Sequence, residues 1–214
     1  MKKQTLLIVT SLTLILIFIL GANAYKKYQS DKTLLKVSEN SSLLVREHSI
    51  TLGNKDAKVH IVEFFDPACE TCAQFHPLVK KIMKENEGKI KLTLRYATFH
   101  EGSEYIVKIL EAARKQDKFW ETLELAFLSQ SYWAVHHKAD PNILWKILPK
   151  VDLDMDKMFQ DVSDPNIDKM IAQDMADAEV LGAKKTPSFF VNGKLLQKFG
   201  YEELKALIHS EMNK

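Results

Sequence analysis

The chain has 214 residues, of which 46% are hydrophobic and 27% charged, and its seven Gly and six Pro are too few for a low-complexity chain. Its 30 basic residues nearly balance its 28 acidic residues, which excludes the basic footprint of a nucleic-acid-binding protein. Two cysteines, Cys69 and Cys72, are too few for a disulfide-stapled mini-protein or a four-cysteine metal site, and their spacing indicates a redox pair. The length favours one domain with an elaboration.

An apolar segment follows the basic residues Lys2 and Lys3 at the N-terminus. Residues 6–20 carry no charge, and Ala22-Asn23-Ala24 then provides the A-x-A pattern of a secretory signal that is cleaved before Tyr25. This arrangement of a basic start, an apolar stretch and small residues predicts export of the rest of the chain.

An uncleaved anchor is the alternative to a cleaved signal. Residues 5–24 are 20 consecutive uncharged residues, which is enough to cross a bilayer. We therefore expect residues 1–24 to be a signal peptide or an N-terminal membrane anchor. Under either hypothesis the positive-inside rule places the domain in the periplasm or on the extracytoplasmic face of the membrane. Residues 25–46 are polar and mixed, and we expect a linker there.

Strand and helix patterns alternate after the expected linker. Val59–Phe65 is a short β-branched and aromatic run that predicts a buried strand. Apolar residues at helical spacing from Phe75 predict a helix that stops at Asn86-Glu87-Gly88. Residues 90–97 alternate as a second strand, whereas residues 103–180 carry helical stripes and almost no strand pattern.

A hairpin and a final helix are predicted near the C-terminus. Asn192-Gly193 joins the β-like runs 188–191 and 194–198, and Tyr201–Met212 is amphipathic. Two strands joined through a helix imply a right-handed parallel crossover, to which the hairpin adds antiparallel strands. This α/β order resembles a thioredoxin fold with a helical insertion after the second core strand.

Two segments extend this resemblance to a particular family. Residues 64–72 read Phe-Phe-Asp-Pro-Ala-Cys-Glu-Thr-Cys, and residues 182–193 read Gly-Ala-Lys-Lys-Thr-Pro-Ser-Phe-Phe-Val-Asn-Gly. They resemble the active-site and proline-loop segments of the DsbA-like thiol–disulfide oxidoreductases, which belong to the thioredoxin-fold superfamily. The resemblance covers residues 47–214 and implies a DsbA-like thioredoxin domain with its helical insertion at about 103–180.

The two cysteines lie where a strand turns into a helix. Cys69 falls in the first helical turn, where unpaired N–H groups and the helix dipole favour a negative sulfur. Such positions lower a thiol pKa from about 8.5 to about 3.5–7.5. We therefore predict that Cys69 attacks and that Cys72, one turn deeper, resolves the mixed disulfide. The Cys69–Cys72 disulfide would itself be the redox centre, so no bound cofactor is expected.

The residues between the cysteines are expected to modulate their chemistry. DsbA-type oxidants often carry Pro-His at these two positions, whereas this chain has Glu70 and Thr71. The carboxylate of Glu70 would repel a thiolate on Cys69 and raise the pKa of that thiol. The sequence thus predicts a milder oxidant than the Pro-His type.

Three further residues complete the predicted site. Glu63 lies in the predicted buried strand, where an isolated carboxylate tends to hold a proton. The resemblance implies that Glu63 accepts or relays the proton of Cys72; the alternative is a solvated place at the strand edge. X-Pro bonds are mostly trans in folded proteins, but the resemblance implies a cis bond between Thr186 and Pro187. The backbone of Thr186 would then pair with an extended substrate chain.

A Cys-x-x-Cys motif can also serve uses other than a redox site. A c-type haem site needs His at position 73, which is Ala73. Cys69, Cys72 and His76 are one ligand short of a structural zinc site, so we assign no metal site. A copper-binding thiol carrier stays open as an alternative, as does a structural disulfide. His76 itself is expected to be a solvated helix residue.

The combined prediction is an extracytoplasmic enzyme that forms or exchanges disulfides in unfolded or reduced secreted proteins. The resemblance implies that a membrane redox partner, linked to quinone, reoxidises it. A disulfide isomerase or reductase is the nearest alternative, because the residues between the cysteines differ from those of the oxidants. Related isomerases use a sizeable dimerisation domain, and residues 25–46 are too short for one, which favours the oxidase.

Overall fold

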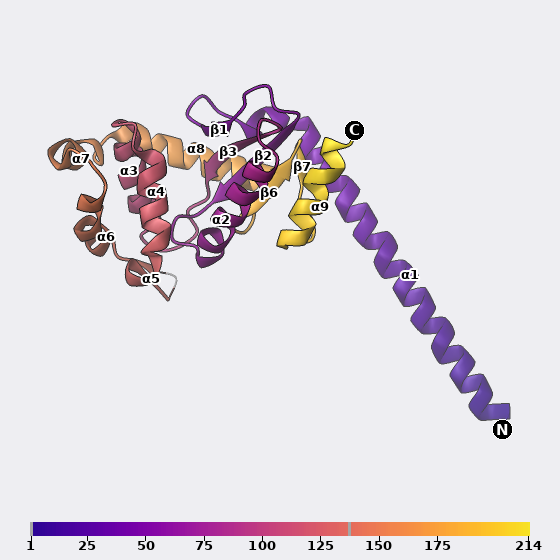
Figure 1. Cartoon of the computed structure of the whole chain (residues 1–214). Helices are drawn as coiled ribbons and strands as arrows, with labels where there is room; N and C mark the ends of the chain where they lie inside the picture. The colour runs from indigo at the N-terminus through magenta and orange to yellow at the C-terminus, as the bar shows by residue number, and fades with distance from the viewer. Residues whose placement is uncertain (1, 137) are drawn as a thin grey trace.

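The computed structural model describes residues 2–136 and 138–214 and is built around one five-stranded sheet (Figure 1). Its strands are β1 (Ile50–Gly53), β2 (Val59–Phe65), β3 (Ile90–Tyr96), β6 (Ser188–Val191) and β7 (Lys194–Leu195). They lie in the order β1-β3-β2-β6-β7, with β2 and β3 parallel and the other neighbours antiparallel. The strand β2 is thus the central one, and the segment with the two cysteines follows it in the chain.

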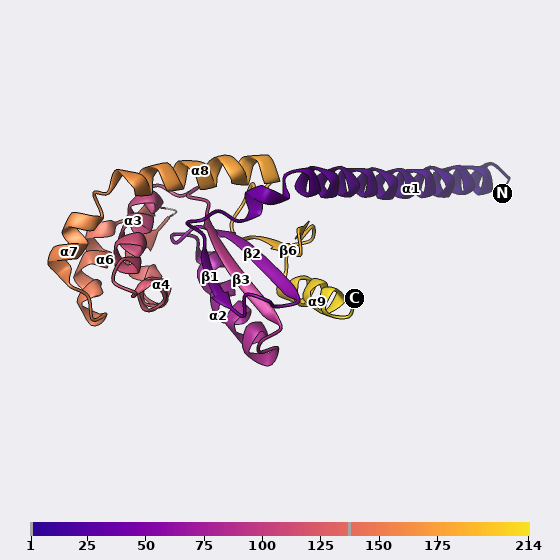
Figure 2. The same cartoon turned by 90° about the horizontal axis from the view of Figure 1, so that it is seen from above.

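Helices cover both faces of this sheet, and a further group of helices lies beyond one end of it (Figure 1 and Figure 2). They are α1 (Lys2–Glu39), α2 (Glu70–Glu85), α3 (Ser103–Arg114), α4 (Phe119–Leu128), α5 (Gln130–Trp133), α6 (Pro141–Ile147), α7 (Met155–Asp161), α8 (Pro165–Leu181) and α9 (Tyr201–Met212). Two 3₁₀ turns, Ser41–Leu44 and Leu148–Lys150, and a small pair of strands, β4 (Ala134–Val135) and β5 (Lys138–Ala139), complete the elements. Figure 2 shows α8 on one side of the sheet and α2 and α9 on the other.

Alternation along the central strand explains this layering. Ile61 and Phe65 face the core that α2 and α9 cover, whereas Val62 and Phe64 face the C-terminal part of α8. A strand that is buried on both faces needs a nearly continuous apolar run, and Val59–Phe65 provides one. Glu63 is the acidic exception in that run.

The predicted α/β thioredoxin fold with a helical insertion is confirmed. The first predicted strand, the end of the active-site helix near Asn86 and the final helix Tyr201–Met212 are found where the patterns indicated. The insertion comprises α3 to α7, after which α8 returns along the sheet. Sequence patterns missed β1, a four-residue edge strand, and they predicted a longer second hairpin strand than the two residues of β7.

The N-terminal segment differs from a simple linker. The helix α1 runs without a break from the apolar segment through residues 25–39, which contain no Gly or Pro to end it. Val37 is fully buried, so this end of the helix packs against the domain. The remainder of α1 projects away, and Leu7–Glu39 is long and apolar enough to cross a membrane (Figure 1). A signal sequence passes the same test.

A buried cluster of charges joins α8 to the sheet. The Arg95 guanidinium on β3 donates to Asp174 at 2.7 and 3.0 Å and to Asp177 at 2.6 Å. Arg46, which follows the N-terminal helix, donates to Asp177 at 2.7 and 2.8 Å. Because Arg95 is fully buried, its charge is compensated by these carboxylates and not by water. The cluster therefore holds together three parts that are far apart in the sequence, namely the segment around Arg46, β3 and α8.

Removal of this buried cation is expected to destabilise the fold. Arg95→Met removes the buried guanidinium from Asp174, which among the described residues keeps only its contacts with the His48 ring and the Tyr96 N–H, so the free energy of unfolding should fall by about 3–5 kcal/mol. Lys198→Met is the matched control, because Lys198 is 84% exposed in its ion pair with Glu203 and should contribute at most about 1 kcal/mol. Urea-induced unfolding of both variants measures the difference. Similar losses in the two variants would contradict the assignment.

Candidate active site

Cys69 and Cys72 lie at the start of α2, shortly after the end of β2 in the chain. Cys69 has the extended backbone of a helix N-cap, with φ −79° and ψ 118°, and Cys72 lies in the first turn. Both are free thiols, Cys69 being 6% exposed and Cys72 completely buried. One sulfur therefore lies next to the surface and the other behind it.

The two thiols differ strongly in acidity. The pKa of Cys69 is lowered to about 5, mainly by a hydrogen bond from the Cys72 side chain. Hydrogen bonds from the Thr186 side chain and from the backbone N–H groups of Cys72 and Thr71 lower it further, whereas burial acts to raise it. Burial raises the pKa of Cys72 well above its ordinary value, and its hydrogen bond to Cys69 adds to that. At neutral pH the site therefore holds a thiolate on Cys69 and a thiol on Cys72.

Glu63 is buried on the central strand and is 4% exposed. Burial raises the pKa of this carboxyl to about 8, and repulsion from Cys69 contributes. The ion pairs between described residues do not include Glu63, so no cation offsets its burial. The alternative of a solvated strand edge does not match this position. A carboxyl group that gains and loses its proton near neutral pH lies close enough to Cys72 to raise the pKa of that thiol.

The proline loop lies against Cys69. The Thr186–Pro187 bond is cis, and Cys69 Sγ lies 3.3 Å from the Thr186 carbonyl oxygen, to which the protonated form of the thiol donates a hydrogen bond. Pro187 is buried and leads into β6, which pairs with β2. The sheet thus brings together the two segments that the sequence separated by 117 positions.

Asp66 is a site residue that sequence reasoning missed. Its completely buried carboxylate accepts hydrogen bonds from the backbone N–H of Ala68 at 2.8 Å, of Phe99 at 2.8 Å and of His100 at 2.9 Å. It also accepts one from the Ser103 hydroxyl. Asp66 therefore fixes the loop before the cysteines to the loop after β3. The Asp-Pro pair looked like an ordinary end of a strand, which concealed this role.

Gln130 is a second residue that was missed, and it comes from the helical insertion. Its side-chain amide donates hydrogen bonds to the carbonyl oxygens of Pro67 at 2.8 Å and Cys69 at 3.1 Å. The residue is only 5% exposed, and its side chain holds the backbone on both sides of Ala68. A lone Gln in a helical block carries no sequence signal for such a contact.

The structure also locates the residues between the cysteines and His76. Glu70 is exposed and Thr71 half-buried in the first turn of α2, as their place in the motif requires. His76 was predicted to be solvated, which is wrong: α4 covers it, with the ring of Phe127 5.2 Å from its own. Within the described parts of the chain, no group of three or more His, Cys, Asp or Glu residues is arranged to hold a metal ion.

Comparison with known proteins identifies the family. A protein-family model described as Thioredoxin matches residues 46–210. The chain is 26% identical over 222 residues to a probable disulfide bond formation protein D from Bacillus cereus, covering 100% of this chain and 98% of that protein. A crystal structure of a thioredoxin-like oxidoreductase from Silicibacter pomeroyi has 27% identity and a TM-score of 0.69, covering 81% of this chain and 97% of that one.

The chain belongs to the thioredoxin family, because the family model covers most of its length. Within that family, the resemblance to DsbA-like thiol–disulfide oxidoreductases is confirmed by the disulfide bond formation protein among its relatives. The chain is also 29% identical over 193 residues to the Na⁺/H⁺ antiporter NhaA 3 of Salinispora tropica, covering 86% of this chain. It spans only 28% of the length of that antiporter.

The acidity of Cys69 should depend on Cys72. In the wild-type protein, alkylation of Cys69 by iodoacetamide should rise through a pH of about 5 and level off by neutral pH. Cys72→Ala removes the main hydrogen bond to the thiolate and should move the midpoint up by about one to two pH units. Cys69→Ala is the control, because loss of the alkylation in this variant shows that the measured reaction occurs at Cys69. An unchanged midpoint in Cys72→Ala would show that other groups set the acidity.

Proposed function

We propose that this protein is an extracytoplasmic thiol–disulfide oxidoreductase that forms disulfides in unfolded or reduced secreted proteins through Cys69-Glu70-Thr71-Cys72. The observation that carries the proposal is the contrast between the two thiols, an acidic Cys69 that is slightly exposed and a weakly acidic Cys72 that is completely buried. We therefore assign Cys69 as the sulfur that bonds to the substrate and Cys72 as the thiol that resolves the mixed disulfide.

The proposed reaction begins with the Cys69–Cys72 disulfide. A substrate thiolate attacks the Cys69 sulfur, a substrate–Cys69 disulfide forms, and the bond to Cys72 breaks. The sulfur of Cys72 then takes a proton, and we assign Glu63 as its source because burial raises the pKa of that carboxyl to about 8. A second substrate thiolate attacks the substrate sulfur, and Cys69 leaves as a thiolate. The substrate loses two electrons and the enzyme gains them.

The acidity of Cys69 favours oxidation over the reverse reaction. A thiol with a low pKa is a good leaving group, and a stabilised thiolate stabilises the reduced enzyme, which makes its disulfide a stronger oxidant. Isomerase or reductase activity is the alternative, with Glu70 as the residue that would weaken the oxidant. A copper-binding thiol carrier is the less favoured alternative, and copper retained on purification and lost on mutation of Cys69 would support it.

Substrate binding and reoxidation complete the proposal. We assign Thr186 and Pro187 to substrate binding, because the carbonyl oxygen of Thr186 lies beside Cys69 and would pair there with an extended chain. A membrane redox partner, linked to quinone, would restore the disulfide. The apolar part of α1 would deliver the domain to the periplasm or hold it at the outer face of the membrane, where both partners occur.

Trapping of intermediates tests the assigned roles. Cys72→Ser should accumulate mixed disulfides with reduced substrate proteins, because Cys69 attacks and no second thiol releases it. Cys69→Ser should accumulate none, since Cys72 is buried. Non-reducing gels followed by mass spectrometry measure both. Complexes held through Cys72 in Cys69→Ser would reverse the assignment.

Replacement of Glu70 tests the electrostatic modulation of the site. Glu70→His removes a negative charge next to the thiolate and should move the reduction potential from near about −180 mV towards about −120 mV. Glu85→His, at the far end of the same helix, is the control and should leave the potential unchanged. Equilibration with glutathione measures all three proteins. A potential that stays constant or becomes more negative in Glu70→His rules out this role for Glu70.

A further inference from the structure

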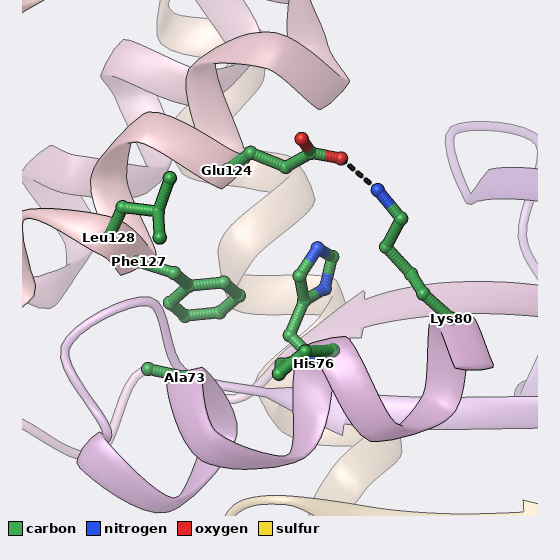
Figure 3. Close-up of a pocket in the computed structure, with 7 residues that line it drawn as sticks. Ala73, His76, Lys80, Glu124, Phe127 and Leu128 are labelled. Carbon is green, nitrogen blue, oxygen red and sulfur yellow. Dashed lines mark hydrogen bonds and ion pairs between the residues drawn. The ribbon is translucent and has the colours of Figure 1, made fainter.

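A cleft of about 350 Å³ opens between α2 and α4 (Figure 3). Its walls are the apolar side chains of Ala73, Pro77, Phe127 and Leu128. An ion pair between Lys80 and Glu124 lies at its rim, and His76 completes the lining. The mechanism proposed above uses none of these side chains. We refer to this feature as the His76 cleft.

His76 presents an unsatisfied polar atom in the cleft. The residue is 8% exposed, and its buried Nε2 has no hydrogen-bond partner among the residues that the structure describes. Figure 3 shows the imidazole standing between Phe127 and Lys80 and facing α4. Because a buried polar atom is costly without a partner, a group that enters the cleft and offers a hydrogen bond is favoured.

The charges of the cleft select an uncharged group. Burial lowers the pKa of His76 to about 4, and nearby Lys80 contributes, so the imidazole is neutral at physiological pH. Lys80 and Glu124 compensate each other at the rim. The matching occupant therefore combines an apolar body with one neutral hydrogen-bonding group at its end, which describes the side chain of tyrosine.

The position of the cleft relates it to the redox site. Ala73 directly follows Cys72 along α2. His76 lies seven residues after Cys69, about 10 Å along the helix axis, a distance that an extended chain covers in about three residues. On the opposite wall, Leu128 is 85% exposed at the mouth, two positions before Gln130, which holds the carbonyl of Cys69. A polypeptide joined to Cys69 can therefore reach the cleft.

We propose that the His76 cleft binds a tyrosine side chain of the polypeptide substrate, with the phenol hydrogen-bonded to His76 Nε2 and the ring between Phe127 and Leu128. This inference rests on the proposed function, because it requires a cysteine-bearing polypeptide at Cys69. It adds a preference for substrates with tyrosine about three residues from the reactive cysteine.

Single-cysteine peptides with tyrosine, phenylalanine or serine at that distance, on either side of the cysteine, test the preference. Each peptide is supplied as its disulfide with thionitrobenzoate and mixed with Cys72→Ser protein in lipid nanodiscs. The Cys69 thiolate attacks the peptide sulfur, the peptide–Cys69 disulfide forms, and thionitrobenzoate leaves as a coloured thiolate. The rate below saturation, relative to that with glutathione, reports recognition.

The tyrosine peptide should react about fivefold faster than the phenylalanine peptide, the factor for about 1 kcal/mol of one net hydrogen bond. Both should exceed the serine peptide by about tenfold. His76→Phe should abolish the advantage of tyrosine over phenylalanine. Leu128→Ser, at an exposed position, should slow both aromatic peptides and leave their ratio unchanged.

The contrary outcomes are distinguishable from one another. Equal, fast rates for the three peptides, or a tyrosine preference that survives His76→Phe, would overturn the cleft assignment and leave the proposed function intact. Rates no faster than with glutathione for every peptide would overturn the proposed function and this inference with it. Sedimentation as a dimer that Leu128→Ser dissociates would place a second copy of the chain in the cleft and overturn a substrate site.

Discussion

A negative charge on the Cys69 sulfur has to be held at a position that is 6% exposed to water. Burial alone would raise the pKa of this thiol, so its acidity requires hydrogen bonds from the protein. The Cys72 thiol supplies the main one, and Thr186 and the backbone N–H groups of the first helical turn supply others. These donors come from α2 and from the loop before β6, and only a sheet that pairs β2 with β6 brings them to one sulfur. The thioredoxin fold is therefore the framework that stabilises the thiolate.

The remaining features of the site keep this arrangement in place. Asp66 and Gln130 both hold the backbone before Cys69, Asp66 through the loop after β3 and Gln130 through the helical insertion. Glu63, behind the pair, retains a proton near neutral pH because burial raises its pKa. The site thus combines a rigid loop, a charged outer sulfur and a protonated interior. Such a combination suits exchange of a disulfide with a partner that approaches from one side.

The sequence was sufficient where a strong local pattern and the structure coincide. The apolar run Val59–Phe65, the Cys-x-x-Cys motif after it and the Asn192-Gly193 turn each predicted their element, and their order predicted the fold. Local patterns could not predict contacts between residues that are far apart in the sequence. His76 was predicted to be solvated because its own helix gives no sign that α4 covers it, and Gln130 acts across 61 positions on Cys69. Residues 25–39 read as a polar linker because burial of Val37 depends on the domain and not on the segment.

Stabilisation of the Cys69 thiolate should make the reduced protein more stable than its disulfide form. Urea-induced unfolding of the two forms at pH 7 and pH 4 tests it directly. The pKa of Cys69 in the folded protein is about 5, below that of an unfolded thiol, so the advantage grows as pH rises above about 5 and is lost as pH falls through that value. We predict that at pH 7 the reduced form withstands more urea, and that the difference shrinks markedly at pH 4. A disulfide form that is the more stable at pH 7, as with an ordinary structural disulfide, would contradict the account.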